Sequence, residues 1–181
     1  MLGQILSFLI ASVAGLLTLA FLARFWLQWT RASFRNPVGE AVITVTNWAV
    51  MPLRRIVPGL LGIDWASVLA AWLTQGIHLF VIGALAGFEV FAFTSLPAIA
   101  WAAVLGMFEL FIYLLMGIVI IAALLSWIAP HAPAAPLFDG LAAPLLSPVR
   151  RFIPIVGGLD FAPLIVVLLL QVMLIVLENL R

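Results

Sequence analysis

The chain has eight arginines, which are the residue type best suited to binding anions. Four of them occur in a segment that is repeated in the sequence. The stretch PLRRIVPGLLGID at residues 52–64 returns as PVRRFIPIVGGLD at residues 148–160. The planar guanidinium fork of arginine is well matched to phosphate. An aspartate just before a helix accepts hydrogen bonds from the first amides and suits the helix dipole. The repeated segment therefore predicts two similar elements that bind anions or position helices.

A second set of polar residues stands inside long apolar runs. Two interpretations of Gln75 and Gln171 are open, because they could bond between helices as part of the packing or could line a polar path for a solute. Glu109 is an acid inside an apolar run, so a transport or proton role is a hypothesis, with His78 as a candidate partner. The candidate intramembrane polar residues are Gln75, His78, Glu109, Tyr113 and Gln171.

Enzymatic and metal chemistry find little support in the sequence. The absence of cysteine excludes disulfides, thiolate ligands and a cysteine nucleophile. His78 and His131 are predicted at very different depths, which disfavours a two-histidine haem or metal site. Neither a G-x-S-x-G nor an H-E-x-x-H nor a P-loop pattern occurs. We therefore expect a protein that is not an enzyme and that holds no metal and no other cofactor.

The composition indicates a membrane protein. Of the 181 residues, 66% are hydrophobic and 8% are charged, whereas a soluble domain is about half apolar and about a quarter charged. A chain of this size could not hide so much apolar surface from water, but a bilayer removes the difficulty. The first apolar run continues to Ala23 without a preceding basic region, which favours a retained helix over a cleaved signal peptide.

The apolar runs have the length of membrane-spanning helices. We therefore predict an all-α membrane protein with four spans, at about residues 4–29, 65–87, 103–129 and 161–178. The third run begins near Pro97 and is longer than one bilayer needs, so either it tilts or its first residues lie outside the hydrocarbon.

Each pair of spans is joined by a connector that predicts a helix on the membrane surface. In the first connector, Asn36-Pro37 is a helix-start signal, and Val38, Val42 and Val45 follow at helical spacing. These features predict amphipathic surface helices over about residues 37–51 and 136–147. The prolines that follow, such as Pro52, are expected to stiffen the chain where it leaves the surface helix.

The placement of the arginines predicts an orientation. The two connectors carry nearly all of them, while the opposite ends of the spans carry almost none. By the positive-inside rule, we expect both connectors to lie in the cytoplasm and both termini to lie on the outer side of the membrane.

A shift of 96 residues superimposes the two halves of the sequence. Rare residues coincide: Pro52 with Pro148, Arg54 with Arg150, Arg55 with Arg151, Asp64 with Asp160 and Gln75 with Gln171. We therefore predict two tandem repeats, at residues 1–90 and 97–181, each consisting of a span, a surface helix and a second span. Because each repeat crosses the membrane twice, the copies have the same orientation and a pseudo-two-fold axis along the membrane normal.

These motifs, with R-F-W-L-Q-W at residues 24–29, resemble the YggT family, which is called YlmG in Gram-positive bacteria and plastids. The resemblance covers nearly the whole chain and is to the two-repeat proteobacterial form. It implies a non-enzymatic membrane protein that organises or assembles other components and is linked to cell division, envelope or osmotic stress. The second copy departs from the pattern, with Ala122 in place of the arginine at Arg24 and Ala132 in place of Asn36. A strictly symmetric pair of sites is therefore not expected.

Two interpretations of the arginines and two functions remain open at this stage. The arginines could only anchor and orient the fold, or they could bind anionic lipids or a membrane-protein partner. The chain could be an organising factor or, as the alternative, a small oligomeric channel or carrier for potassium or another osmolyte. Homo-oligomers are compatible with both functions, and direct binding of nucleic acid is not expected. The candidate lipid- or partner-binding residues are Arg24, Arg31, Arg35, Arg54, Arg55, Arg150 and Arg151, and the candidate helix caps are Asn36, Asp64 and Asp160.

Overall fold

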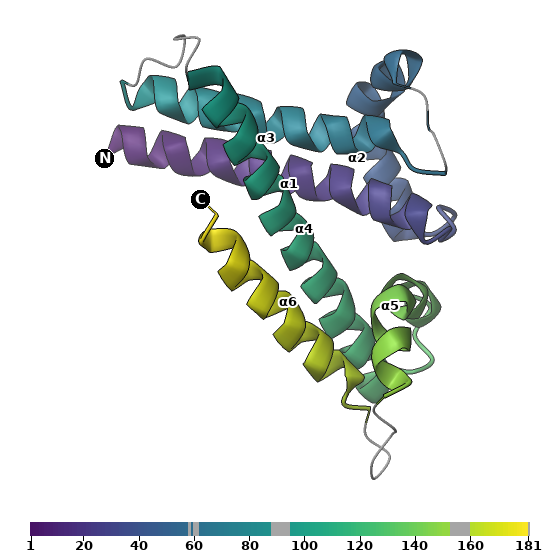
Figure 1. Ribbon diagram of the computed structural model, residues 1–181. Coiled ribbons are helices and arrows are strands. Elements are labelled where there is room, and N and C mark those ends of the chain that lie inside the picture. Colours follow the sequence, from purple (N-terminus) through teal and green to yellow (C-terminus); the bar gives the residue numbers. More distant parts are fainter. Residues whose placement is uncertain (58, 60–61, 88–94, 153–159, 181) are drawn as a thin grey trace.

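The chain is all-helical in the part that the computed structural model describes, which is residues 1–57, 59, 62–87, 95–152 and 160–180. This outcome confirms the predicted helical class. In chain order the helices are α1 (Leu2–Trp29), α2 (Pro37–Ile56), α3 (Trp65–Leu85), α4 (Ser95–Ile128), α5 (Ala135–Arg150) and α6 (Ala162–Glu178) (Figure 1).

Three of these helices, α1, α3 and α4, have the length and apolar character needed to cross a membrane. Helix α4 has 34 residues and measures about 51 Å along its axis, well beyond a hydrocarbon core of about 30 Å. Helix α6 is also strongly apolar, but it is shorter, with 17 residues. The chain therefore has the helices of a membrane protein.

The helices form two hairpins that carry their short connecting helices at the same end. Figure 1 shows α1 and α3 side by side and antiparallel, with α4 crossing them obliquely and α6 running back along α4. Helix α2 bridges α1 and α3, and α5 bridges α4 and α6. The two termini lie toward the opposite end of the molecule from α2 and α5 (Figure 1).

The buried side chains form two apolar clusters, one for each hairpin. In the first, Phe21 of α1, Val50 of α2 and Ala66 of α3 are almost fully buried, with Met107 of α4 against them. In the second, α4, α5 and α6 contribute together with Trp26 and Leu27 from the end of α1, and Val119 is fully buried. Alanines where the helices meet allow the backbones to approach closely, which is how helices pack in a bilayer.

Tryptophan side chains tie the two hairpins together. The Trp26 indole nitrogen donates a hydrogen bond to the Leu141 carbonyl at 3.1 Å, which links α1 to α5. The Trp72 indole nitrogen donates to the Ala100 carbonyl, also at 3.1 Å, which links α3 to α4. The Trp26 ring also meets Phe111 edge-on, with centroids 5.5 Å apart. These hydrogen bonds are directional, so they fix the position of one hairpin relative to the other. Apolar packing alone would allow the two hairpins to slide past each other.

The connecting helix α2 extends further than the sequence predicted. It ends at Ile56, and Pro52 lies inside it, so this proline does not mark the exit from the helix and that prediction is wrong. The amide that proline lacks costs one backbone bond, but the last turn still closes, with Val57 donating to Leu53 at 2.8 Å. Arg54 and Arg55 fall in this last turn, where cations suit the helix dipole.

We predict that Trp26→Phe lowers the free energy of unfolding by about 1–3 kcal/mol. The substitution keeps an aromatic ring but leaves the buried Leu141 carbonyl without its donor. Trp127→Phe is the matched control, because the Trp127 side chain is 60% exposed and the change should be nearly neutral. Unfolding in mixed detergent micelles measures both variants, and equal effects would contradict the assigned link between the hairpins.

Candidate functional site

The carboxylate of Asp64 is the centre of the most connected polar site in the described part of the chain. It lies between α2 and α3 and is 1% exposed. The Arg54 Nε atom donates to Asp64 Oδ1 at 3.2 Å, and Arg54 Nη2 donates to Oδ2 at 2.6 Å. The Ser67 hydroxyl, one turn into α3, also donates to Oδ2 at 2.7 Å. A paired guanidinium–carboxylate contact of this kind fixes geometry as well as charge.

A second guanidinium, that of Arg24 in α1, reaches the same carboxylate. Its Nε atom lies 3.6 Å from Asp64 Oδ2, and its side chain is nearly as buried. The Arg24 Nη1 atom donates to Thr46 Oγ1 and Asn47 Oδ1 of α2, at 2.8 Å each. One arginine thus joins α1, α2 and α3, because a buried charge must be paired and hydrogen-bonded. We call Arg24, Arg54, Asp64 and their hydrogen-bond partners the Asp64 cluster.

The Asp64 cluster holds one more positive than negative charge when all three groups are ionised. Burial by itself would raise the pKa of Asp64, but hydrogen bonds from Arg54 and Ser67 and the charges of both arginines hold it below its usual value. Asp64 is therefore a carboxylate at neutral pH. Arg54 also donates to Gln28 Oε1 at 2.9 Å, and its side chain is 42% exposed, so the uncompensated charge is accessible at the rim.

The three predicted helix caps behave differently. Asn36 Oδ1 accepts a hydrogen bond from the Gly39 amide at 2.9 Å, and Asp160 Oδ1 accepts one from the Ala162 amide at 2.9 Å. Asp64 occupies the N-cap position of α3 but makes no side-chain cap bond. The prediction that its side chain caps α3 is wrong, because both oxygens are engaged by Arg54 and Ser67.

The second repeat keeps only the simplest part of this arrangement. Arg150 pairs with Asp160 at 2.7 Å, but the side chains are 51% and 22% exposed. Ala122 and Ala142, which stand in place of Arg24 and Thr46, are buried together in the apolar cluster of the second hairpin. A polar interior in the first hairpin therefore corresponds to an apolar one in the second.

Four participants in the Asp64 cluster were not singled out as site residues from the sequence. Thr46, Asn47 and Ser67 are common residue types without a recognisable motif, and Gln28 stands in the R-F-W-L-Q-W stretch without a role assigned to it. The counterparts of Thr46, Asn47 and Ser67 in the second copy, at the shift of 96, are Ala142, Ala143 and Pro163, whereas Gln28, in the register that places Ala122 opposite Arg24, corresponds to Ser126. The joint loss of the first three polar residues with the arginine was the signal that could have identified them.

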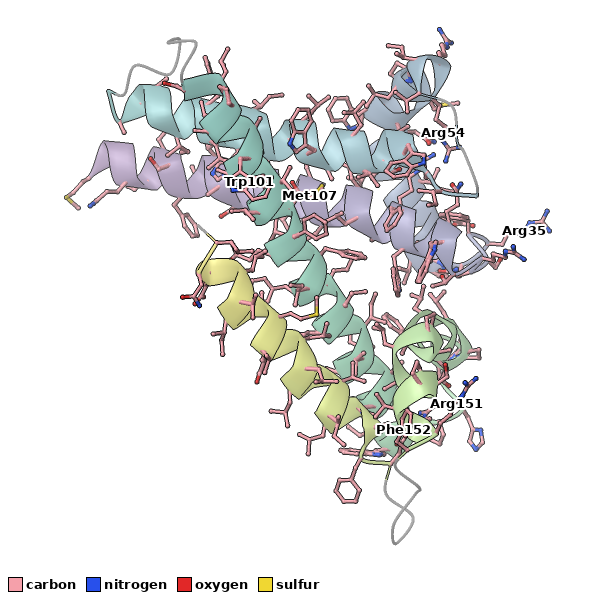
Figure 2. All side chains as sticks on the ribbon, viewed as in Figure 1. Arg35, Arg54, Trp101, Met107, Arg151 and Phe152 are labelled. Atoms are coloured by element: carbon pink, nitrogen blue, oxygen red, sulfur yellow. The ribbon has the colours of Figure 1, made fainter. Side chains whose placement is uncertain are left out.

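The other candidate arginines are exposed at the same end of the molecule. Figure 2 shows Arg35, Arg54 and Arg151 on the side where the connecting helices lie. Arg31 is also exposed and has a φ of +56°, a left-handed conformation that favours glycine. It closes α1 with the amide bonds of a Schellman motif, from Arg31 to Gln28 and from Ala32 to Leu27. At the equivalent position after α3 the chain has Gly87, with a φ of +81°.

The intramembrane polar candidates are not brought together into one site. Gln75 is buried and donates to Thr18 Oγ1 of α1 at 3.2 Å, which is a bond between helices. Gln171 and Tyr113 are exposed. The buried Nδ1 atom of His78 has no hydrogen-bond partner among the described residues.

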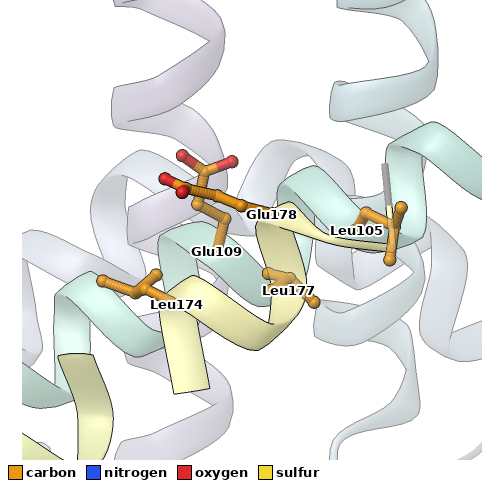
Figure 3. Close-up of a pocket in the computed structure, with 5 residues that line it drawn as sticks. All are labelled: Leu105, Glu109, Leu174, Leu177 and Glu178. Carbon is orange, nitrogen blue, oxygen red and sulfur yellow. The ribbon is translucent and has the colours of Figure 1, made fainter. Parts of the chain in front are cut away.

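Glu109 lies beside a second acid at the far end of α6. Figure 3 shows Glu109 of α4 and Glu178 of α6 projecting toward one another. They line a cavity of about 10 Å³ together with Leu105, Leu174 and Leu177, which is room for about one water molecule. Three larger cavities, of about 280, 570 and 180 Å³, lie along α3 and α4 and are lined by apolar side chains and Gly76.

Comparison with known proteins gives a family match over both halves of the chain. A family model described as CCB3/YggT matches residues 3–85 and again residues 101–181. An uncharacterized protein YggT of Escherichia coli is 38% identical over 168 residues, which is 92% of this chain and 86% of that protein. An uncharacterized protein of Pseudomonas aeruginosa is 35% identical over 176 residues, which is 96% of this chain and 88% of that protein. No solved structure matches the chain.

We predict that Asp64→Asn lowers the free energy of unfolding by about 3–5 kcal/mol near pH 7, because it leaves two guanidinium groups without their buried counter-charge. Since the folded pKa is depressed, the stabilisation is fully present above the unfolded pKa of about 4 and is lost as the pH falls through the folded pKa. The difference between wild type and variant should thus be constant from neutral pH to about pH 5 and shrink below that.

Unfolding in mixed micelles at several pH values measures this difference. Asp160→Asn is the matched control, and its cost should be only about 1 kcal/mol because its ion pair is exposed and one cap bond is affected. Equal losses for the two variants, or a difference that grows toward acid pH, would contradict the role of Asp64.

Proposed function

The chain belongs to the CCB3/YggT family, and we propose that it is a non-enzymatic membrane protein that organises or assembles other membrane components. The observation that carries this proposal is the Asp64 cluster. It holds α1, α2 and α3 in one fixed arrangement and leaves the half-exposed guanidinium of Arg54 at its rim. The cluster does not present a catalytic acid or base, because both carboxylate oxygens of Asp64 already accept hydrogen bonds from guanidinium and hydroxyl donors. The geometry suits a rigid recognition surface.

We further propose that all four apolar helices α1, α3, α4 and α6 span a bacterial inner membrane as two tandem repeats of the same orientation. The 17 residues of α6 cover about 25 Å, close to the hydrocarbon thickness. The end with α2, α5 and the exposed arginines would lie in the cytoplasm, and both termini in the periplasm. On this placement Glu109 and Glu178 lie near the outer surface of the bilayer.

The proposed recognition surface consists of the exposed side of α2 and the arginines beside it. Trp48, Met51 and Ile56 are strongly exposed, at 67%, 62% and 78%. Arg55 is exposed next to them in sequence, and Arg31 is exposed just after the end of α1, at the end of the molecule where α2 lies. Apolar side chains that alternate with cations suit the boundary between headgroups and acyl chains. Anionic lipids supply the phosphate that arginine binds, and a membrane-protein partner would dock at the same face.

The backbone of Arg31 supports a functional reason for its charge. A non-glycine residue in the left-handed region costs about 1–2 kcal/mol, and glycine occupies the equivalent position after α3. Retaining arginine at a position that glycine would fit better is understandable if the charge is used. The processes served by this surface would be those implied by the YggT resemblance, namely cell division and the response to envelope or osmotic stress.

We predict that Arg31→Gly raises the free energy of unfolding by about 1 kcal/mol and weakens binding of anionic phospholipid. Native mass spectrometry of the detergent-solubilised protein, titrated with phosphatidylglycerol, measures the second effect. Arg31→Lys is the control that keeps the charge and the strained backbone, so it should retain binding without a gain in stability. An Arg31→Gly protein that binds the lipid as well as wild type would contradict a role for this cation.

The organising role itself is tested by crosslinking in cells from a photoreactive residue at position 48. We expect a specific protein adduct that is lost in the Asp64→Asn variant, because the surface loses its fixed shape, and that survives in Asp160→Asn. A photoreactive residue at Val13, exposed on α1 far from this surface, is the control. Potassium flux in proteoliposomes that is abolished by Gln75→Leu or Glu109→Gln would contradict the proposal and favour a channel.

A further inference from the structure

Gln171 is a polar residue on the outer face of an otherwise apolar helix. It lies nine residues after the start of α6, about 14 Å along the axis, so it falls near the middle of the helix. Its side chain is exposed and makes no hydrogen bond with any residue that the structure describes. On the proposed four-span arrangement, on which this inference rests, its amide points into hydrocarbon near the midplane of the bilayer.

An amide in hydrocarbon needs a hydrogen-bonding partner, because no water is present to replace it. The equivalent residue of the first repeat, Gln75, has one in Thr18 of α1. Helix α4, which packs against α6 as α1 packs against α3, carries only apolar residues in the corresponding turn, Leu114 to Met116. Gln171 therefore has no partner among the residues that the structure describes, and a partner from outside the chain would satisfy it.

The residues around Gln171 form a regular seam. Leu164, Leu168, Gln171 and Ile175 follow one another at intervals of four, three and four residues, and all four are exposed. This spacing keeps them on one face, opposite Val166 and Leu170, which are buried against the rest of the protein. Alternating intervals of four and three are the pattern of helices that pair along a narrow seam, and one polar residue in such a seam fixes the register.

We propose that this seam binds a second copy of the chain, with α6 against the partner's α6 and Gln171 hydrogen-bonded to the partner's Gln171. A two-fold axis along the membrane normal brings the same residue of both copies to the same depth. The glutamine amide carries both donors and acceptors, so its partial charges complement those of an identical amide. The two copies can therefore satisfy each other with two hydrogen bonds.

A second copy fits the seam better than the other occupants that a bilayer offers. Acyl chains could cover the three apolar residues but could not satisfy the amide. A different protein would need its own polar residue at the same depth, whereas the two-fold axis supplies one automatically. The dimer would also leave α2 free, because α2 packs on α1 and α3 and lies on the far side of the molecule from α6 (Figure 1).

The natural absence of cysteine makes disulfide crosslinking a direct test. In native membranes treated with a mild oxidant, Leu168→Cys and Ile175→Cys should each give a disulfide-linked dimer. Leu169→Cys is the matched control, because Leu169 is equally exposed but points about 100° away around the helix. Crosslinking at position 169 equal to that at position 168, or none at positions 168 and 175, would overturn the inference.

A second experiment isolates the amide. Dimer dissociation on dilution with lipid, measured by fluorescence energy transfer, should show that Gln171→Leu raises the dissociation constant about threefold to twentyfold, which corresponds to measured interhelical hydrogen bonds in membranes. Gln171→Asn, which keeps the amide, should dimerise more tightly than Gln171→Leu. A leucine variant that dimerises as well as wild type would overturn the assigned role of Gln171.

Labelling of Gln171→Cys separates failure of this inference from failure of the proposed arrangement. Protection from a water-soluble thiol reagent in intact membranes, together with a dimer, supports both. Protection without any dimer overturns the inference alone and leaves the spanning role of α6 standing. Ready labelling from water overturns both. Crosslinking of Leu168→Cys should persist in an Arg54→Ala background, since the seam and the Asp64 cluster are separate.

Discussion

The requirement that a buried charge be paired governs the structure of the first hairpin. Asp64 is removed from water where three helices meet, and only the two guanidinium groups and the Ser67 hydroxyl make that burial tolerable. Because Arg24 also binds Thr46 and Asn47, its geometry fixes α2 relative to α1. The orientation of the connecting helix, and with it the surface that we propose for recognition, follows from these bonds.

The two halves of the chain, which the same family model matches, form hairpins with different interiors. The second keeps an arginine–aspartate pair near the start of its returning helix, but this pair is partly exposed, and alanines fill the interior positions of the guanidinium and the threonine. Apolar packing of this kind is often as stable as a buried ion pair. The Asp64 cluster of the first hairpin adds a single defined arrangement of helices with an accessible positive charge. The two hairpins are therefore suited to different roles.

The sequence was sufficient for the elements whose signals are local. Apolar runs predicted helices close to the observed ones, and Asn36-Pro37 stands at the start of α2. The partner of Asp64 was missed because Arg54 is ten residues away across a turn whose path depends on tertiary packing. The polar role of Thr46 and Asn47 was missed for the same reason, since neither residue type has a distinctive pattern. Only their replacement by alanine in the second copy marks them.

The coupling energy between Arg54 and Asp64 tests the central claim most directly. A double-mutant cycle with Arg54→Ala and Asp64→Ala, measured by unfolding in mixed micelles, should give about 2–3 kcal/mol, because the pair is fixed by two hydrogen bonds at a buried carboxylate. The same cycle for Arg150 and Asp160 should give less than about 1 kcal/mol. Similar couplings for the two pairs would contradict the claim that the buried cluster fixes the first hairpin.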